Sequence, residues 1–186
     1  MKKNLKAKAY MYPVPVLIIG TYDEKGVPNA MNAAWGTICD TDSVAIVLSA
    51  SHKTTKNLLK TKAFTVAMAD EKNVVKADYV GVVSALDVPN KIEKSGWHTV
   101  KSQFVNAPII EELPLVLECE LVSYDFDSEI CIGKVVNVCA DESILDKKGK
   151  VDLTSFKPIC YDCDTHGYYT LGKKVGNAFL DGLKLK

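Results

Sequence analysis

The sequence predicts a mainly β fold, an antiparallel β-barrel with helical insertions. Short apolar, β-branched segments recur along the 186-residue chain and are separated by turn residues, which is typical of small barrels. The alternation of strand and helix that a doubly wound parallel sheet requires is missing from the sequence. The length suits one domain, and no linker, repeat or low-complexity tract divides it, so we expect residues 1–186 to form a single domain.

A β-hairpin is expected near the start of the chain. Residues 14–22 (VPVLIIGTY) are apolar and β-branched, and residues 27–37 (VPNAMNAAWGT) form the returning strand. Residues 23–26 (DEKG) between them are a turn signal. Residues 44–48 (VAIVL) are apolar throughout and predict a further buried strand.

A short helix follows that strand. Residues 53–62 (KTTKNLLKTK) predict a helix with Leu58 and Leu59 facing inward and the lysines outward. The other expected elements are a strand at 63–69, helical or irregular segments at 71–81 and 84–94, longer strands at 115–124 and 131–140, a polar connection at 146–150, and one or two helical turns within 175–183.

The charge balance argues against a nucleic-acid partner. Lysines and arginines number 23, as do aspartates and glutamates, so the formal net charge is zero and no basic excess is present. Every basic residue is lysine, so the bidentate phosphate contact that arginine makes is unavailable. Any phosphate site must therefore use lysine, hydroxyl groups and backbone N–H groups.

The sequence predicts a cytoplasmic protein. No apolar run reaches the length that spans a bilayer, so we expect no membrane association, and no apolar segment typical of a signal peptide follows the N-terminal lysines. Six cysteines at irregular spacings, in a chain too long to need disulfides, are expected to be reduced.

Several familiar motifs are absent or incomplete. The dinucleotide fingerprint G-x-G-x-x-G and the hydrolase motif G-x-S-x-G do not occur. Residues 167–174 (GYYTLGKK) resemble a phosphate-binding P-loop but lack its final Ser or Thr. The alternating carboxylates Asp125, Asp127 and Glu129 have no apolar enclosure to separate their pKa values, so they indicate a solvated turn. His98 is expected to be a packing or surface residue. No catalytic side chain is predicted.

A Cys-x-x-Cys pair, Cys160 and Cys163, lies close to His166. It could be a redox dithiol or part of a metal site, but no second ligand pair completes a structural zinc site, and the neighbouring residues indicate a loop. Two reduced cysteines in a loop near the surface are the favoured interpretation. No metal site is predicted.

Two segments carry the functional prediction. Residues 29–37 (NAMNAAWGT) contain many small side chains, which allow a ligand such as a flat ring to approach the backbone closely. A tightly packed core strand with a β-bulge explains the same composition equally well. Residues 49–57 (SASHKTTKN) follow a buried strand and open a helix, whose unpaired N–H groups suit a phosphate. A simple N-cap by Ser51 or Thr54 is the alternative, but it does not require so many donors.

These segments together resemble the flavin-reductase-like proteins, including the flavoredoxins, which have a Greek-key FMN-binding split barrel. Residues 28–35 resemble the family strand that lines the isoalloxazine, and Ser51, Lys53, Thr55 and Asn57 resemble its phosphate segment. Further matches are Asp78, Tyr79, Gly81 and Ser84 for an Asp-Tyr-x-Gly motif followed by Ser, and Tyr169, Gly176, Ala178 and Phe179 for a C-terminal Tyr–Gly–Ala-Phe pattern. The resemblance runs from about Tyr12 to the end. Lys53 stands where many relatives have arginine, and the family pattern does not explain the Cys160–Cys163 loop.

The resemblance implies a homodimer with one FMN per subunit and defines the candidate site. The expected cofactor-binding residues are Asn29, Ala30, Met31, Asn32, Ala33, Ala34, Trp35, Ser49, Ala50, Ser51, His52, Lys53, Thr54, Thr55, Asn57, Tyr79, Ser84 and Tyr169. One hypothesis is an FMN-dependent oxidoreductase that takes hydride from NADH or NADPH. Alternatives are an FMN-binding electron carrier reduced by a partner protein, and a split barrel that has lost flavin and binds another ligand.

Overall fold

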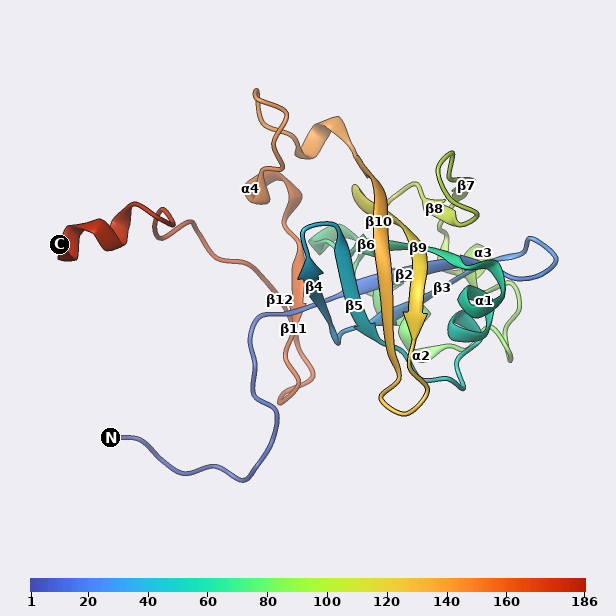
Figure 1. Ribbon diagram of the computed structural model, residues 1–186, viewed down its shortest axis with the longest axis horizontal. Coiled ribbons are helices and arrows are strands. Elements are labelled where there is room, and N and C mark those ends of the chain that lie inside the picture. The colour runs from blue at the N-terminus through green and yellow to red at the C-terminus, as the bar shows by residue number, and fades with distance from the viewer.

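The computed structural model describes residues 1–186, and its body is a curled antiparallel sheet of seven strands (Figure 1). The strand order is β3-β2-β6-β9-β10-β5-β4. The strands are β2 (Leu17–Tyr22), β3 (Pro28–Ala33), β4 (Gly36–Asp40), β5 (Ser43–Val47), β6 (Ala63–Met68), β9 (Leu115–Tyr124) and β10 (Ile130–Ala140). The two edge strands, β3 and β4, are consecutive in the chain and are joined by Ala34 and Trp35 alone.

Strand β2 separates two hydrophobic cores because its side chains alternate between the faces of the sheet. Leu17 and Ile19 point into the curl, where they pack in a cluster that includes Phe64. Val16 and Ile18 belong to a second cluster on the outer face. Burial on both faces explains why residues 14–22 are almost continuously apolar.

Helices cover the outer face and one end of the sheet. The α-helices are α1 (Lys53–Thr61), α2 (Val74–Val82), α3 (Lys91–Ser95) and α4 (Leu153–Phe156), and the 3₁₀ turns are η1 (Glu71–Asn73), η2 (Glu142–Ile144) and η3 (Asp181–Leu185). Ala77 and Val80 of α2 pack with Trp97 in the outer cluster. None of the helices has both the length and the apolar character needed to cross a membrane.

Two smaller sheets complete the fold. β1 (Val14–Pro15), β11 (Ile159–Tyr161) and β12 (Tyr168–Thr170) form a three-stranded sheet, and β7 (Thr99–Lys101) pairs with β8 (Pro108–Ile110). The chain ends project from this body as two arms (Figure 1). Residues 1–12 and 171–186 are exposed, with only Asp181 half-buried.

The predicted mainly β barrel and most of its elements are confirmed. The hairpin of β2 and β3 has the expected turn, and α1, β6, β9 and β10 lie within a few residues of their predicted bounds. The predicted strand at 27–37 is wrong in one respect, because it breaks after Ala33 and resumes at Gly36 as β4, which pairs with β5 instead. Within the predicted tail region, helical structure is limited to the turn η3.

A lysine that the sequence analysis did not single out is buried beneath α2. Lys91 is only 3% exposed, and its ammonium group donates to the carbonyl oxygens of Val80 at 3.1 Å and Val83 at 2.8 Å, at the C-terminal end of the helix. Last-turn carbonyl groups of a helix lack intrahelical donors, so the contact satisfies them. Burial lowers the pKa of Lys91 to about 8.

We expect the stability advantage of the parent over Lys91→Met to grow as the pH rises from 8 to 10. In this range Lys91 is deprotonated in the folded state but still protonated in the unfolded chain, so raising the pH favours folding. The full shift corresponds to about 3 kcal/mol. Urea unfolding of both proteins at pH 7.5, 8.5 and 9.5 measures the difference. A difference independent of pH would contradict the prediction.

Candidate functional site

A loop at the start of α1 presents backbone donors that have no acceptor in the chain. His52 is the N-cap residue, but its side chain makes no capping hydrogen bond. The N–H groups of Lys53, Thr54 and Thr55 also lack a partner. The simple N-cap by Ser51 or Thr54 is therefore not formed. An uncapped helix start carries partial positive charge and binds anions.

Buried hydrogen bonds hold this loop against the sheet. The Thr55 hydroxyl donates to the carbonyl of Ser49 at 2.7 Å, and the Asn57 amide donates to the Thr21 hydroxyl at 3.1 Å. The amide of Asn29, on β3, donates to the Thr54 hydroxyl at 2.7 Å. Thr55 was expected to offer its hydroxyl to a phosphate, but the structure uses that proton to position the loop.

Asn29 also leaves one buried acceptor without a partner. Its residue is 3% exposed, and its Oδ1 atom accepts no hydrogen bond. Buried polar atoms are satisfied in most folded proteins, so an orphan beside an uncapped helix start indicates a place where a ligand donor fits. Asn29 as a cofactor-binding residue stays a prediction.

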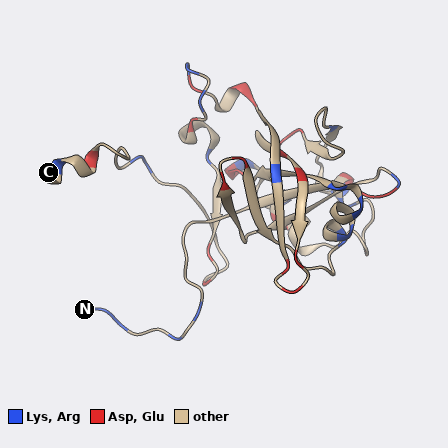
Figure 2. Ribbon diagram, in the orientation of Figure 1, with Lys and Arg blue, Asp and Glu red and all other residues tan.

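The loop already holds one anionic group, which the sequence analysis missed. Glu129, at the turn between β9 and β10, accepts from the N–H of Ala50 at 2.8 Å and from the hydroxyl of Ser49 at 2.9 Å. These bonds lower the pKa of the Glu129 carboxyl. The turn is acidic (Figure 2), and its Asp125 caps the turn backbone as a solvated residue would. The predicted turn is exposed at Asp125 and Asp127, and Glu129 at its end is half-buried against the loop.

Three further loop residues predicted for the site, Ser51, His52 and Lys53, are less buried than Thr54 and Thr55. Ser51 and His52 are exposed, and the Ser51 hydroxyl lies 3.1 Å from that of Ser49. The Lys53 ammonium lies 3.4 Å from the Asp23 carboxylate, so its charge is partly compensated. These three residues are at the uncapped start of α1 in the chain.

The strand β3 borders the same region with a free edge. It pairs with β2 on one side and with no strand on the other. Asn32 donates to the carbonyl of Ala77 in α2 at 3.1 Å. A side chain at Gly81 would place its Cβ 3.0 Å from Asn32, so glycine allows α2 to approach this strand closely. Of the other strand residues predicted for the site, Ala30 and Ala33 are buried, and Met31 and Ala34 are half-buried.

Three residues predicted for the site, Tyr79, Ser84 and Tyr169, come from later parts of the chain than β3 and the α1 loop. Tyr79 packs against the outer core, Ser84 caps a turn by accepting from Leu86 at 3.1 Å, and Tyr169 is 54% exposed on β12. The neighbouring Tyr168 instead donates to Asp78 at 2.8 Å. Burial, together with this bond, raises the pKa of Tyr168 to about 12. The assignment of Tyr169 to the cofactor site stays a prediction.

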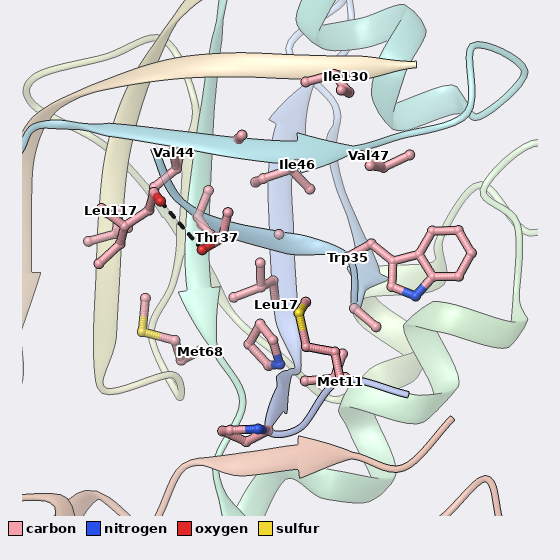
Figure 3. Close-up of a pocket in the computed structure, with 18 of the residues that line it drawn as sticks. Met11, Leu17, Trp35, Thr37, Val44, Ile46, Val47, Met68, Leu117 and Ile130 are labelled. Carbon is pink, nitrogen blue, oxygen red and sulfur yellow. Dashed lines mark hydrogen bonds between the residues drawn. The ribbon is translucent and has the colours of Figure 1, made fainter. Parts of the chain in front are cut away.

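An apolar cavity of about 780 Å³ opens where β3 passes into β4 (Figure 3). Of its 20 lining residues, 16 are hydrophobic. Leu17 and Ile46 line it from the sheet, Met11 from the N-terminal arm, and Trp35 from the link between the edge strands. Trp35 is 66% exposed, although such large aromatic side chains are usually well covered.

A split antiparallel barrel with an uncapped helix start beside a free edge strand defines a β protein with a candidate site for an anionic ligand. The chain belongs to the flavin reductase like domain family, whose model matches residues 9–162. This finding and the fold confirm the predicted resemblance to flavin-reductase-like split barrels.

Solved structures agree with this assignment. The chain is 32% identical to the flavoredoxin of Desulfovibrio vulgaris (Miyazaki F), with a TM-score of 0.93 over 98% of this chain and 100% of that one. It is 25% identical to a flavoredoxin from Methanosarcina acetivorans, with a TM-score of 0.89 and all of both chains covered. An FMN-binding domain from Shewanella baltica shares the fold, at 19% identity, a TM-score of 0.80 and 88% of each chain.

The loop geometry predicts different effects for two threonines of α1. Thr55→Val removes the bond to the Ser49 carbonyl, and Thr61→Val removes a similar bond to the Asn57 carbonyl. We expect each to lower the free energy of unfolding by about 1 kcal/mol. Hydrogen exchange at the Ala50 amide should accelerate only in Thr55→Val. Equal acceleration in both variants, or none in Thr55→Val, would show that Thr55 does not hold the loop.

Proposed function

We propose that this protein binds FMN and works as an FMN-dependent oxidoreductase. The observation that carries the proposal is the uncapped start of α1 beside the unpartnered Oδ1 atom of Asn29. Membership of the flavin reductase like domain family supports a flavin, and the FMN-binding domain that shares the fold supports FMN in particular. The third hypothesis, a barrel that has lost its flavin, has no comparable support.

The residues present fit such a cofactor. The N–H groups of residues 53–55, the Ser51 hydroxyl and the Lys53 ammonium would bind the phosphate. The free edge of β3, from Asn29 to Ala33, offers backbone donors and acceptors to a flat ring. Bound flavin supplies the redox chemistry, accepting a hydride or single electrons. The role of this chain is to bind and orient it, and no side chain is assigned as acid or base.

The electron donor distinguishes two forms of this function. In the first, NADH or NADPH delivers hydride to the bound flavin, and membership of a flavin reductase like family supports reduction of a flavin. In the second, the protein is an electron carrier reduced by a partner protein, which the similarity to flavoredoxins favours. Six cysteines without a disulfide are in keeping with the proposed cytoplasmic location.

An absorption spectrum of the purified protein with added FMN, recorded without air, tests this function. We expect a bound-flavin spectrum that bleaches within seconds of adding NADH or NADPH. A bound-flavin spectrum that persists with both nucleotides, yet bleaches with dithionite, would identify the carrier. The absence of bound flavin after incubation with FMN would refute the proposal.

Two lysines of α1 provide a matched test of the phosphate site. Lys53 lies at the start of the helix and pairs with Asp23, whereas Lys60 lies at its end and pairs with Glu24. We expect Lys53→Ala to weaken FMN binding about tenfold, since hydrogen bonds to charged groups contribute about 1.5–3 kcal/mol and partial exposure weakens this one. Lys60→Ala should leave it unchanged. Quenching of FMN fluorescence measures both dissociation constants, and equal values would place the phosphate elsewhere.

We also propose that two copies associate. Apolar side chains are exposed at the mouth of the cavity, among them Ile38 at 78% and Trp35 at 66%. In the C-terminal arm, Val175 is 93% and Phe179 is 97% exposed. Surfaces of this kind usually meet a partner. Light scattering should give twice the 20.4 kDa chain mass, and a mass of one chain would refute the homodimer.

A further inference from the structure

The C-terminal arm ends in a small folded unit that makes no hydrogen bond to the rest of its chain. The Asp181 carboxylate accepts from the N–H of Asn177 at 2.8 Å, and the turn η3 follows directly. A side chain at Gly176 would place its Cβ 2.8 Å from this carboxylate, so glycine permits the compact turn. The hydrogen bonds and ion pair of residues 171–186 all stay within the arm. Helical turns this short are not stable alone in water, so the unit needs a surface to pack against.

Four large apolar side chains of this unit face solvent. They are between 51% and 97% exposed, and they belong to Phe179, Leu180, Leu183 and Leu185. Phe179 also has a φ of 64°, a left-handed conformation that bulky residues rarely adopt. Such conformations persist where the surrounding structure imposes them. Nothing in the same chain surrounds Phe179, so we infer that another surface does.

The body of the protein contains the complementary feature, the apolar cavity beside Trp35. Its volume of about 780 Å³ lies within the range of roughly 300–1,000 Å³ that accommodates ligands of drug size, so several apolar side chains can enter it. The C-terminal arm extends away from the body (Figure 1), and no residue of this arm lines the cavity of its own chain. Each chain therefore has one apolar arm and one apolar cavity that do not meet.

The arm and the mouth of the cavity carry opposite charges (Figure 2). Asp40 lies two residues beyond the cavity-lining Ile38, and Asp127 lies three residues before the cavity-lining Ile130. Both carboxylates are exposed, and neither forms an ion pair. The lysines of the arm without a carboxylate partner are Lys173, Lys174 and Lys186. Opposite charges of this kind orient two surfaces as they meet.

We propose that the C-terminal arm of each chain docks in the apolar cavity of a second copy, with Phe179 and Leu180 inside it. The contact is reciprocal, because a two-fold pair fills both cavities and uses both arms, and such closed pairs are the commonest oligomers. The proposal rests on the association of two copies proposed above and names the contact that produces it. Because Ala34 and Trp35 line the cavity, each arm also covers the residues that follow the proposed flavin strand of the other copy.

The first experiment measures the dimer dissociation constant of the flavin-free protein by sedimentation equilibrium. Phe179→Asp places a charge in the apolar cavity, and we expect it to raise this constant about thirtyfold, as for residues that dominate an interface. Phe104→Asp alters a phenylalanine that is 60% exposed on the β7–β8 loop and should leave the constant unchanged. Phe179 is 97% exposed in the single chain, so its substitution should leave the circular dichroism spectrum unchanged. Equal constants for the parent and Phe179→Asp would overturn the proposal.

The second experiment uses tryptophan fluorescence to follow the cavity mouth. The chain has two tryptophans, and Trp97 is only 3% exposed, so quenching by acrylamide reports mainly on Trp35. We expect weak quenching in the parent dimer and strong quenching in Phe179→Asp, because removal of the arm uncovers Trp35. Strong quenching in both proteins would show that the arm does not cover the cavity.

The third experiment locates the arm with a disulfide. Unlabelled and isotope-labelled chains of Phe179→Cys are mixed and oxidised mildly, and their peptides are analysed by mass spectrometry. Cys163 lines the cavity, so we expect a bridge between positions 163 and 179 that joins one labelled and one unlabelled chain. Addition of Cys163→Ser should abolish it, and Lys2→Cys, exposed in the other arm, should form no bridge to Cys163. A bridge confined to single chains, or no bridge to Cys163, would contradict the docking.

Failure of the docking and failure of the homodimer are distinguishable. A parent mass of one chain would refute the homodimer, and the docking with it. A parent dimer that withstands Phe179→Asp would refute the docking alone. None of the three measurements requires FMN, so their outcomes are independent of the proposed flavin function.

Discussion

The fold depends on one covalent constraint, the two-residue link between the edge strands of the main sheet. Ala34 and Trp35 connect β3 to β4, and three consecutive Cα–Cα steps span at most roughly 11 Å. In a flat sheet the first and seventh strands would lie roughly 29 Å apart, at about 4.8 Å per strand. The sheet must therefore curl until its edges approach. Because β3 and β4 still do not pair with each other, the barrel stays split along this line.

The candidate site follows from that split. The free edge of β3 is left without a strand partner where the barrel would otherwise close, and the apolar cavity opens beside Trp35. Helix α1 is fastened to the same strand by the bond from Asn29 to Thr54. The free edge strand and the uncapped helix start are thus held together by buried groups, which is the fixed positioning that the proposed cofactor site would require.

Local signals allowed much of this to be predicted from the sequence. The apolar run at 14–22 and its turn predicted the hairpin, and the cluster of Ser, Lys and Thr before Leu58 predicted a helix with an open start. The break at Ala34 could not be predicted, because small residues suit either a continuous strand or a bend. Glu129 and Tyr168 reach their partners, Ser49 and Asp78, across 80 and 90 residues of chain. Such contacts depend on tertiary packing, which no local pattern reveals.

The charges around the loop explain why the position of its backbone N–H groups would matter more for phosphate binding than its lysine side chain does. The charge of Lys53 is offset by Asp23, and Glu129 adds a negative charge at Ala50. Attraction for a phosphate must then come mainly from the N–H groups at the start of α1, and this effect fades beyond the first helical turn. A small displacement of the loop would lose most of it. The partly buried bond from Thr55 to Ser49 would therefore matter to the proposed phosphate site as much as any group that contacts the phosphate.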